Sequence, residues 1–452
     1  MNPRDRQILH IALPSIVSNI TVPLLGLVDV AIVGHLGAPA YIGAIAVGGM
    51  LFNIIYWMFA FLRMGTSGMT AQAWGSRDLP ETVRLLIRAV GIGWIVALGL
   101  IVLQEPIRQG ALLIIRPTEE VALPATRYFR ICIYGAPAML GLYGLTGWFV
   151  GMQNTRIPML VAITQNVMNI AASLILVFGC GLKVEGVALG TLIAQYGGLF
   201  MAIGLGIRYY GRLGRYVRLQ GRHLSVGREN EPSNNSLWQR DAMSRFFRVN
   251  RDIFLRTVCI ASVTLYSTSA GAMLGDIILA ANTLLMQLFL LFSYIMDGFA
   301  FAGEALSGRY TGARNERAFH ETLRRLFVWG GGSALLFSLT YGCGGVAFLS
   351  LLTDEREVIN AASRYFGWAI AIPIVSVTAF IWDGIFIGAT ATRGMLVSMA
   401  SAAATFFVLY FSLRTPLGNH ALWLAFVTYL FMRGAVQSLL AGKVIREAFP
   451  RK

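Results

Sequence analysis

The chain has little charge for its length. Only 13% of its 452 residues are charged, about half the share of an average soluble domain. The four cysteines form no CxxC pair, the five histidines show no ligand spacing, and no His-Asp or Ser-His cluster occurs. We therefore expect no disulfide framework, no metal and no cofactor, and the chain is not expected to be an enzyme.

Long apolar runs take the place of charge. Apolar residues make up 56% of the chain, and many runs approach the roughly 20 residues that cross a bilayer as a helix. The runs lack the alternation of β-strands, and only helices or closed barrels satisfy their backbone in lipid. We predict an all-α integral membrane protein of twelve transmembrane helices, which begin near residues 10, 43, 85, 127, 157, 184, 252, 279, 324, 362, 394 and 420.

The net charge of +15 is concentrated in alternate loops. Arginine and lysine gather at residues 77–88, 208–251 and 443–452, whereas the intervening loops are short or mixed in charge. This is the positive-inside pattern, and it places both termini in the cytoplasm. The basic charge therefore predicts topology, and no nucleic-acid partner is expected.

One segment occurs twice, 237 positions apart. Residues 147–156 (GWFVGMQNTR) return as residues 384–393 (GIFIGATATR), and an Arg-Tyr-Phe motif recurs at the same offset. Many transporters consist of two such copies with the substrate site between them. Two six-helix copies cross the membrane in the same sense, so a parallel pseudo-two-fold repeat is expected. The predicted parts are an N-lobe at 1–210 (helices 1–6), a basic cytoplasmic linker at 211–250 and a C-lobe at 251–452 (helices 7–12).

Charged side chains inside the spans need an explanation, because each costs at least about 2.5–3.5 kcal/mol on insertion scales. Asp29 lies within the first span. The same span carries Pro14 and Pro23, which cannot donate backbone hydrogen bonds and predict a hinge. Asp29 is therefore a candidate proton-binding group, and the alternative is that Arg63 or amide side chains hold it as a fixed structural contact.

Three more carboxylates lie in spans of the second half. Asp297 and Glu304 are two turns apart and share one helix face, while Asp383 belongs to the repeated motif. They are candidate proton sites, and structural ion pairs are the alternative. The predicted intramembrane counter-charges are Arg63 and Arg256.

Uncharged polar groups and methionines also occur within the spans. In-membrane amides often join helices rather than bind ligands, whereas Met and aromatic side chains line adaptable cavities. The candidate substrate-cavity residues are Met50, Tyr56, Tyr143, Asn282, Met286, Gln287 and Tyr294.

These residues resemble the multidrug and toxic compound extrusion (MATE) family, in its DinF branch. The resemblance covers nearly the whole chain, and its most specific stretches are residues 13–29, 61–65, 297–300, 383–390 and 418–423. It implies two six-helix lobes around a central cavity that opens alternately to each side. It also implies efflux of bulky, cationic or amphipathic compounds in exchange for protons or sodium.

The resemblance assigns roles to single residues. Asp29 matches the helix 1 acid of the family, and Pro14 matches the proline linked to helix 1 bending. Asn169 and Thr191 match polar partners of that acid, and Asp383 matches the C-lobe acid of sodium-coupled relatives.

One position departs from the pattern. Ser173 stands where archaeal relatives of this branch carry a second acid. Either Asp29 works with Asn169, Ser173 and Thr191, or the C-lobe carboxylates share the task. Arg256 stands near the helix 7 acid of some sodium-coupled relatives, which favours protons as the coupling ion.

The sequence therefore predicts a monomeric, proton-coupled efflux antiporter of the bacterial inner membrane. Its expected partners are membrane lipid and small amphipathic substrates. The alternatives are sodium coupling, or a flippase or exporter of a lipid-linked or amphipathic anionic metabolite.

Overall fold

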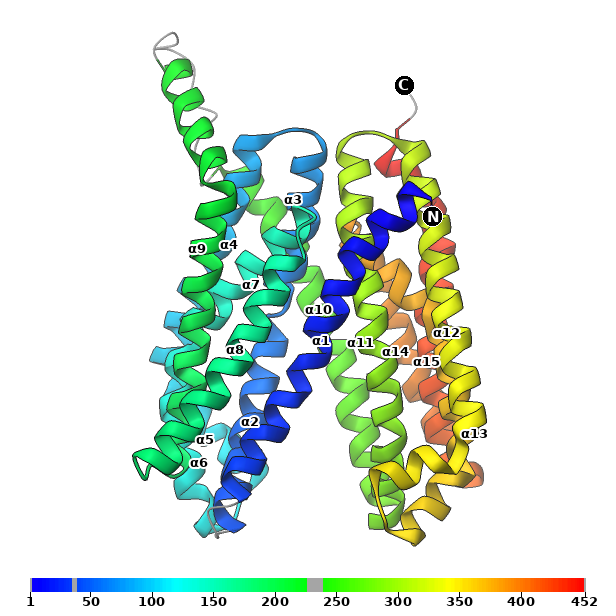
Figure 1. Ribbon diagram of the computed structural model, residues 1–452. Coiled ribbons are helices and arrows are strands. Elements are labelled where there is room, and N and C mark those ends of the chain that lie inside the picture. The colour runs from blue at the N-terminus through cyan, green and yellow to red at the C-terminus, as the bar shows by residue number, and fades with distance from the viewer. Residues whose placement is uncertain (1, 35–38, 226–238, 451–452) are drawn as a thin grey trace. The chain divides into compact units, whose positions relative to one another are not determined.

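The computed structural model describes residues 2–34, 39–225 and 239–450, and no strand occurs within them. The chain forms two compact units, one of Val17–Phe246 and one of Met1–Ile16 with Phe247–Lys452. Each unit is a bundle of helices (Figure 1). The expected N-lobe began at residue 1, whereas residues up to 16 pack with the C-terminal half of the chain.

Two polar contacts to distant residues explain why the first sixteen residues group with the second half of the chain. Arg4 forms an ion pair with Glu321, with 3.2 Å between Nε and Oε2. Trp329 donates a hydrogen bond from Nε1 to Asp5 at 3.1 Å. Polar anchors to residues more than 300 positions away thus tie the start of the chain to the second unit.

The unit of residues 17–246 contains six transmembrane spans, the first of which is formed by α1 (Pro3–Gly34). Its other elements are α2 (Pro39–Phe59), α3 (Phe61–Gly75), α4 (Leu79–Val102), α5 (Gln104–Ile115), α6 (Glu119–Cys132), the 3₁₀ helix η1 (Ile133–Gly135), α7 (Ala136–Gly151), α8 (Arg156–Leu174), the π-helix η2 (Ile175–Gly179) and α9 (Val184–Ser225). In the described residues, α2 with α3 and α8 with η2 each form one span. The elements α6, η1 and α7 follow one another without a gap, and we count them as the fourth span.

The fourth span is broken, although a continuous helix was expected there. Pro137 lies in the first turn of α7, directly after the 3₁₀ turn of η1. Proline has no backbone N–H and fixes its own φ, so it begins a helix more readily than it continues one.

The second unit holds six long helical elements. They are α10 (Arg240–Met273), α11 (Asp276–Gly312), α12 (Glu316–Leu352), α13 (Arg356–Gly388), α14 (Thr392–Leu417) and α15 (Asn419–Ala448). Of these, α12 is kinked at Gly345, where the backbone is not helical. Over the described ranges, ten spans are individually long and apolar enough to cross a membrane. Together with α1 and the broken fourth span they make the twelve that were predicted.

The repeat is visible in the backbone turns of both units. Arg77, before α4, and Arg314, before α12, adopt left-handed φ values of 61° and 51°. The next residue caps each helix: Asp78 accepts from the Glu81 N–H at 2.9 Å, and Asn315 accepts from the Ala318 N–H at 3.0 Å. Side chains that accept from the first-turn N–H groups stabilise helix starts.

The repeated glycines allow two pairs of helices to touch. A Cβ atom on Gly147 of α7 would overlap the Arg63 carbonyl of α3, and one on Gly384 of α13 would overlap the Ala300 carbonyl of α11. Gly384 lies 237 positions after Gly147, and Ala300 lies 237 positions after Arg63. The repeat therefore includes a conserved backbone approach within each unit as well as a sequence motif.

The predicted linker at 211–250 is helical at both ends. The α9 helix continues to Ser225, and α10 begins at Arg240. The polar middle of the predicted linker falls on residues 226–238, outside the described residues.

Candidate functional site

Three side chains hold Asp383 of α13. Arg433 donates from Nη2 to Oδ2 at 2.7 Å, Gln437 donates from Nε2 to Oδ1 at 2.6 Å, and Arg256 also donates to Oδ2. All four side chains are buried. A buried carboxylate that accepts from two guanidinium groups is a fixed ion-pair network. Both oxygens of Asp383 are therefore engaged by the protein.

Two of these partners were not among the predicted site residues. Arg433 lies inside the last apolar span, so the cost of a charge in a membrane helix, which singled out Asp383, applies to it equally. Gln437 is four residues further along α15 and shares that helix face. An amide in a span is common, so Gln437 carried no comparable signal.

The other two C-lobe carboxylates lie on α11. Asp297 is half-buried, within electrostatic range of Arg433. Glu304 is fully buried, and its carbonyl lies against Gly388 of α13. The two acids that the sequence places on one face of α11 therefore lie in different surroundings. Asp297 is near the Asp383 network, and Glu304 is at the contact between α11 and α13.

Asp29 of α1 has a different environment. It is buried, with 7% of its surface exposed. Among the described residues, its Oδ1 accepts no hydrogen bond and the carboxylate forms no ion pair. Arg63, its expected counter-charge, lies on α3 within electrostatic range of Tyr143. Asp29 is therefore a buried carboxylate without a described cation to neutralise it.

Polar side chains of α8 and α9 meet in the same unit. Asn169 donates from Nδ2 to the Thr191 hydroxyl at 2.9 Å. Within the described chain, neither Oδ1 of Asn169 nor Oγ of Ser173 has a hydrogen-bond partner. Tyr128 of α6 lies within electrostatic range of Asp29 and beside Thr191, so these groups belong to one region.

This region has the chemistry of a small cation site. A carboxylate, an amide oxygen and a hydroxyl oxygen are all acceptors, and each buried acceptor without a donor costs about 1–3 kcal/mol. A proton on the carboxylate, water or a hard cation would satisfy them. In the ranges that the structure covers, no cluster of three His, Cys, Asp or Glu side chains is arranged to hold a metal ion.

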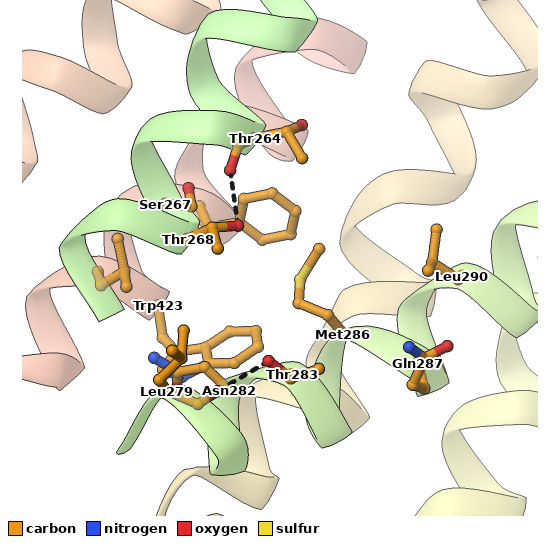
Figure 2. Close-up of a pocket in the computed structure, with 12 residues that line it drawn as sticks. Thr264, Ser267, Thr268, Leu279, Asn282, Thr283, Met286, Gln287, Leu290 and Trp423 are labelled. Carbon is orange, nitrogen blue, oxygen red and sulfur yellow. Dashed lines mark hydrogen bonds between the residues drawn. The ribbon is translucent and has the colours of Figure 1, made fainter. Parts of the chain in front are cut away.

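Three predicted cavity residues come together. Asn282, Met286 and Gln287 line a space of about 300 Å³ formed by α10, α11 and α15, and Figure 2 shows the lining side chains gathered around it. Tyr294 lies further along α11, near Asp297, and does not line it.

The remaining cavity candidates belong to the unit of residues 17–246. Met50 is half-exposed, and Tyr56 is buried with its ring 5.6 Å from that of Phe52. Tyr143 is half-buried near Arg63. The structure does not bring these side chains into one described cavity.

The predicted hinge prolines lie within a continuous α1. The helix runs through both Pro14 and Pro23 without a break. The boundary between the two compact units falls after Ile16, two residues beyond Pro14. The predicted bending position is therefore where the chain passes from one packed unit to the other.

Comparison with known proteins identifies the family. The MatE family model matches residues 14–175 and 253–412. The chain is 38% identical to DNA damage-inducible protein F of Escherichia coli (strain K12) over 95% of this chain and 90% of that protein. It is 26% identical to the probable multidrug resistance protein NorM of Acinetobacter baylyi, over 69% of this chain and 66% of the relative.

Solved structures show the same architecture. A MATE structure in a bent conformation superposes with a TM-score of 0.85 at 16% identity, covering 99% of this chain and 96% of that one. An outward-facing MATE transporter gives a TM-score of 0.85 at 16% identity, with 100% and 98% covered. The predicted all-α fold of twelve helices in two six-helix lobes is confirmed. This chain belongs to the MATE family, in its DinF branch, and is a multi-pass membrane transporter rather than an enzyme.

Proposed function

We propose that the chain is a secondary active efflux antiporter of the bacterial inner membrane. It exports bulky cationic or amphipathic compounds in exchange for protons, by alternating access, and both of its termini lie in the cytoplasm. The MATE family membership and the names of the relatives support efflux. The alternation of basic loops supports the orientation.

The observation that carries proton coupling is the contrast between two buried carboxylates. Asp383 is bonded to Arg256, Arg433 and Gln437. Asp29 has no ion pair among the described residues. An uncompensated ionised carboxylate in a membrane interior is unfavourable, and protonation removes that cost.

The chemistry of the exchange follows from this contrast. When a proton binds Asp29, the unit loses a buried negative charge, and Asn169, Ser173 and Thr191 rearrange their hydrogen bonds around a neutral carboxyl group. A ligand that binds one state better than the other shifts the population between them. Inward- and outward-facing states thereby respond to protonation, and substrate release is linked to proton uptake.

The energy available is sufficient for concentrative export. One charge that moves down 100 mV releases about 2.3 kcal/mol. Since about 1.4 kcal/mol corresponds to a tenfold ratio, one proton exchanged for an electrically neutral compound supports roughly a fifty-fold gradient of that compound. Exchange of one proton for one monovalent cation moves no net charge, so the pH gradient alone drives that exchange.

Sodium coupling at the C-lobe is less well supported. A sodium ion at Asp383 would have to displace the guanidinium groups of Arg256 and Arg433, which already occupy the carboxylate. Sodium could bind in the Asp29 region, because the acceptors without hydrogen-bond partners there are oxygen atoms. The test must therefore separate proton coupling from sodium coupling.

The test is ethidium transport in proteoliposomes under an imposed pH gradient or an imposed sodium gradient. We expect flux with the pH gradient alone, its loss in Asp29→Asn, and its retention in Asp354→Asn, a matched exposed acid. Flux that requires sodium would overturn proton coupling. Absence of flux under both gradients would overturn antiport of this substrate class and favour a flippase.

A further inference from the structure

The cavity among α10, α11 and α15 has an unusual hydrogen-bonding surface. Among the residues that the structure describes, no charged side chain lines it. Its polar lining comes mostly from Ser and Thr hydroxyls, and its apolar lining includes Trp423, Phe426 and Met286. A volume of about 300 Å³ is at the lower end of the range for small-ligand pockets, roughly 300–1,000 Å³.

Three of the four hydroxyl groups that line the cavity donate their protons within their own helices. Ser267 donates to the Val263 carbonyl at 2.7 Å, Thr268 donates to the Thr264 carbonyl at 3.2 Å, and Thr283 donates to the Leu279 carbonyl at 2.8 Å. A hydroxyl group has one donor and two acceptor lone pairs. What these three groups still offer to a ligand is therefore acceptor oxygen.

Two amides line the cavity, those of Asn282 and Gln287, and that of Asn282 is engaged within the protein. Asn282 and Asn419 exchange two hydrogen bonds at 2.8 and 2.9 Å, and Trp423 donates its indole N–H to Asn282 at 2.8 Å. The indole has no second donor, so it presents only its ring to a ligand. The network holds the aromatic wall in place and removes two of its donors from the cavity.

We propose that this cavity is a subsite for flat aromatic cations that carry N–H donors, such as ring amines and amidines. Ser267, Thr268 and Thr283 supply acceptors for the N–H groups, and the faces of Trp423 and Phe426 attract the delocalised positive charge. The inference rests on the proposed efflux function and deepens it, because it selects within the class of cationic compounds.

The surface also predicts what the subsite rejects. Among the described lining residues an anionic group finds no cation, and Ser267, Thr268 and Thr283 offer it no hydroxyl proton, so its donors are the Gln287 amide and the Thr264 hydroxyl. A fully N-alkylated cation leaves the acceptors of those three residues unpaired. A site built to hydrogen-bond a donor discriminates against an analogue that lacks it. Proflavine and acridine orange form a suitable pair, because both share one acridine ring and the second replaces the two amino groups by dimethylamino groups.

The experiment is equilibrium binding of the two dyes to the purified full-length protein in detergent, measured by fluorescence polarisation. Wild type is expected to bind proflavine more tightly than acridine orange. In Thr268→Val combined with Thr283→Val, proflavine affinity is expected to fall about 5- to 10-fold, the size of one to two hydrogen bonds, while acridine orange binding is unchanged.

Thr340→Val is the matched control. Thr340 is exposed on α12, donates to the Leu336 carbonyl at 2.7 Å, and does not line the cavity. Unfolding temperatures of all variants establish that they are folded. Equal affinities for the two dyes in wild type, an equal loss of both in the double variant, or the same loss in Thr340→Val would overturn the subsite.

Dye binding is measured without an ion gradient. The proposed subsite and the proposed antiport function can therefore be contradicted independently of each other. Dye discrimination that persists without gradient-driven flux would overturn the antiport function alone. Gradient-driven flux with no dye discrimination would overturn the subsite alone.

Discussion

Arg433 lies 2.7 Å from Asp383, measured from Nη2 to Oδ2, and its guanidinium also lies over the rings of Phe380 and Tyr429. Arg256 donates to the same carboxylate oxygen. The cluster has two positive groups and one negative group in a buried site, so the carboxylate is needed to hold the guanidinium groups together.

Removal of this carboxylate is expected to destabilise the protein. Asp383→Asn leaves two buried guanidinium groups without their counter-charge, and breaking a buried pair costs about 3–5 kcal/mol. Thermal unfolding of purified protein measures the loss. Adding Arg256→Gln to Asp383→Asn removes one uncompensated charge and should recover part of the stability. An Asp383→Asn variant as stable as wild type would contradict the fixed-network interpretation.

The hydrogen bond between Asn169 and Thr191 is expected to support the Asp29 region. Thr191→Val removes the acceptor of the 2.9 Å bond, and bonds of this type in membranes contribute about 0.6–1.7 kcal/mol. Unfolding temperature should fall modestly, and proton-driven flux should fall with it. Thr191→Ser keeps the hydroxyl and should behave like wild type; a serine variant as impaired as the valine variant would exclude this bond as the cause.

The close approach of α13 to α11 makes a further prediction. Gly384→Ala places a methyl group on the Ala300 carbonyl, and because backbone cannot move aside cheaply, we expect a loss of about 1–3 kcal/mol. Gly331→Ala on α12 is the control, since a Cβ atom there meets nothing within 4 Å. That control should be neutral or stabilising by up to about 1 kcal/mol. Similar unfolding temperatures for the two variants would argue against the packing account.

A pH-dependent contribution is expected at α5, which is not among the spanning helices. Hydrogen bonds donated by Arg108, and secondarily by Gln109, lower the pKa of Glu105 from 4.5 to about 2. A lowered folded-state pKa stabilises the protein above pH 4.5, and this contribution is lost as pH falls toward 2. Glu105→Gln should therefore lower the unfolding temperature at pH 7, with a smaller difference below pH 4.

The control for this measurement is Glu120→Gln, an exposed acid on α6. It should give the same small difference at both pH values. A Glu105→Gln effect that does not change with pH would show that the carboxylate charge is not responsible.

The helices and their grouping could be predicted from local composition. Within the described ranges, ten of the spans are long enough and apolar enough to be recognised from their own residues. The 237-residue repeat divides the spans into two sets of six. The break at Ile133–Gly135 was missed, although Pro137 marks it, because apolar composition alone does not register where a helix is interrupted.

The candidate site could be predicted only in part. Asp29 was recognised because a charge within an apolar run is costly wherever it lies. Its lack of an ion pair among the described residues could not be predicted, since that depends on which side chains the neighbouring helices present. The same limitation left Arg433 and Gln437 out of the predicted set.

By itself, the sequence determined that the protein is a helical membrane protein with two related halves and a small number of intramembrane charges. Those properties depend on composition and on spacing along one chain. The tertiary structure decided what each charge does. It brings Arg256 and Arg433, 127 and 50 positions from Asp383, onto one carboxylate, and it leaves Asp29 without such a partner in the described chain. Electrostatic interactions in a membrane interior depend on distances of a few ångströms, and only helix packing sets these distances.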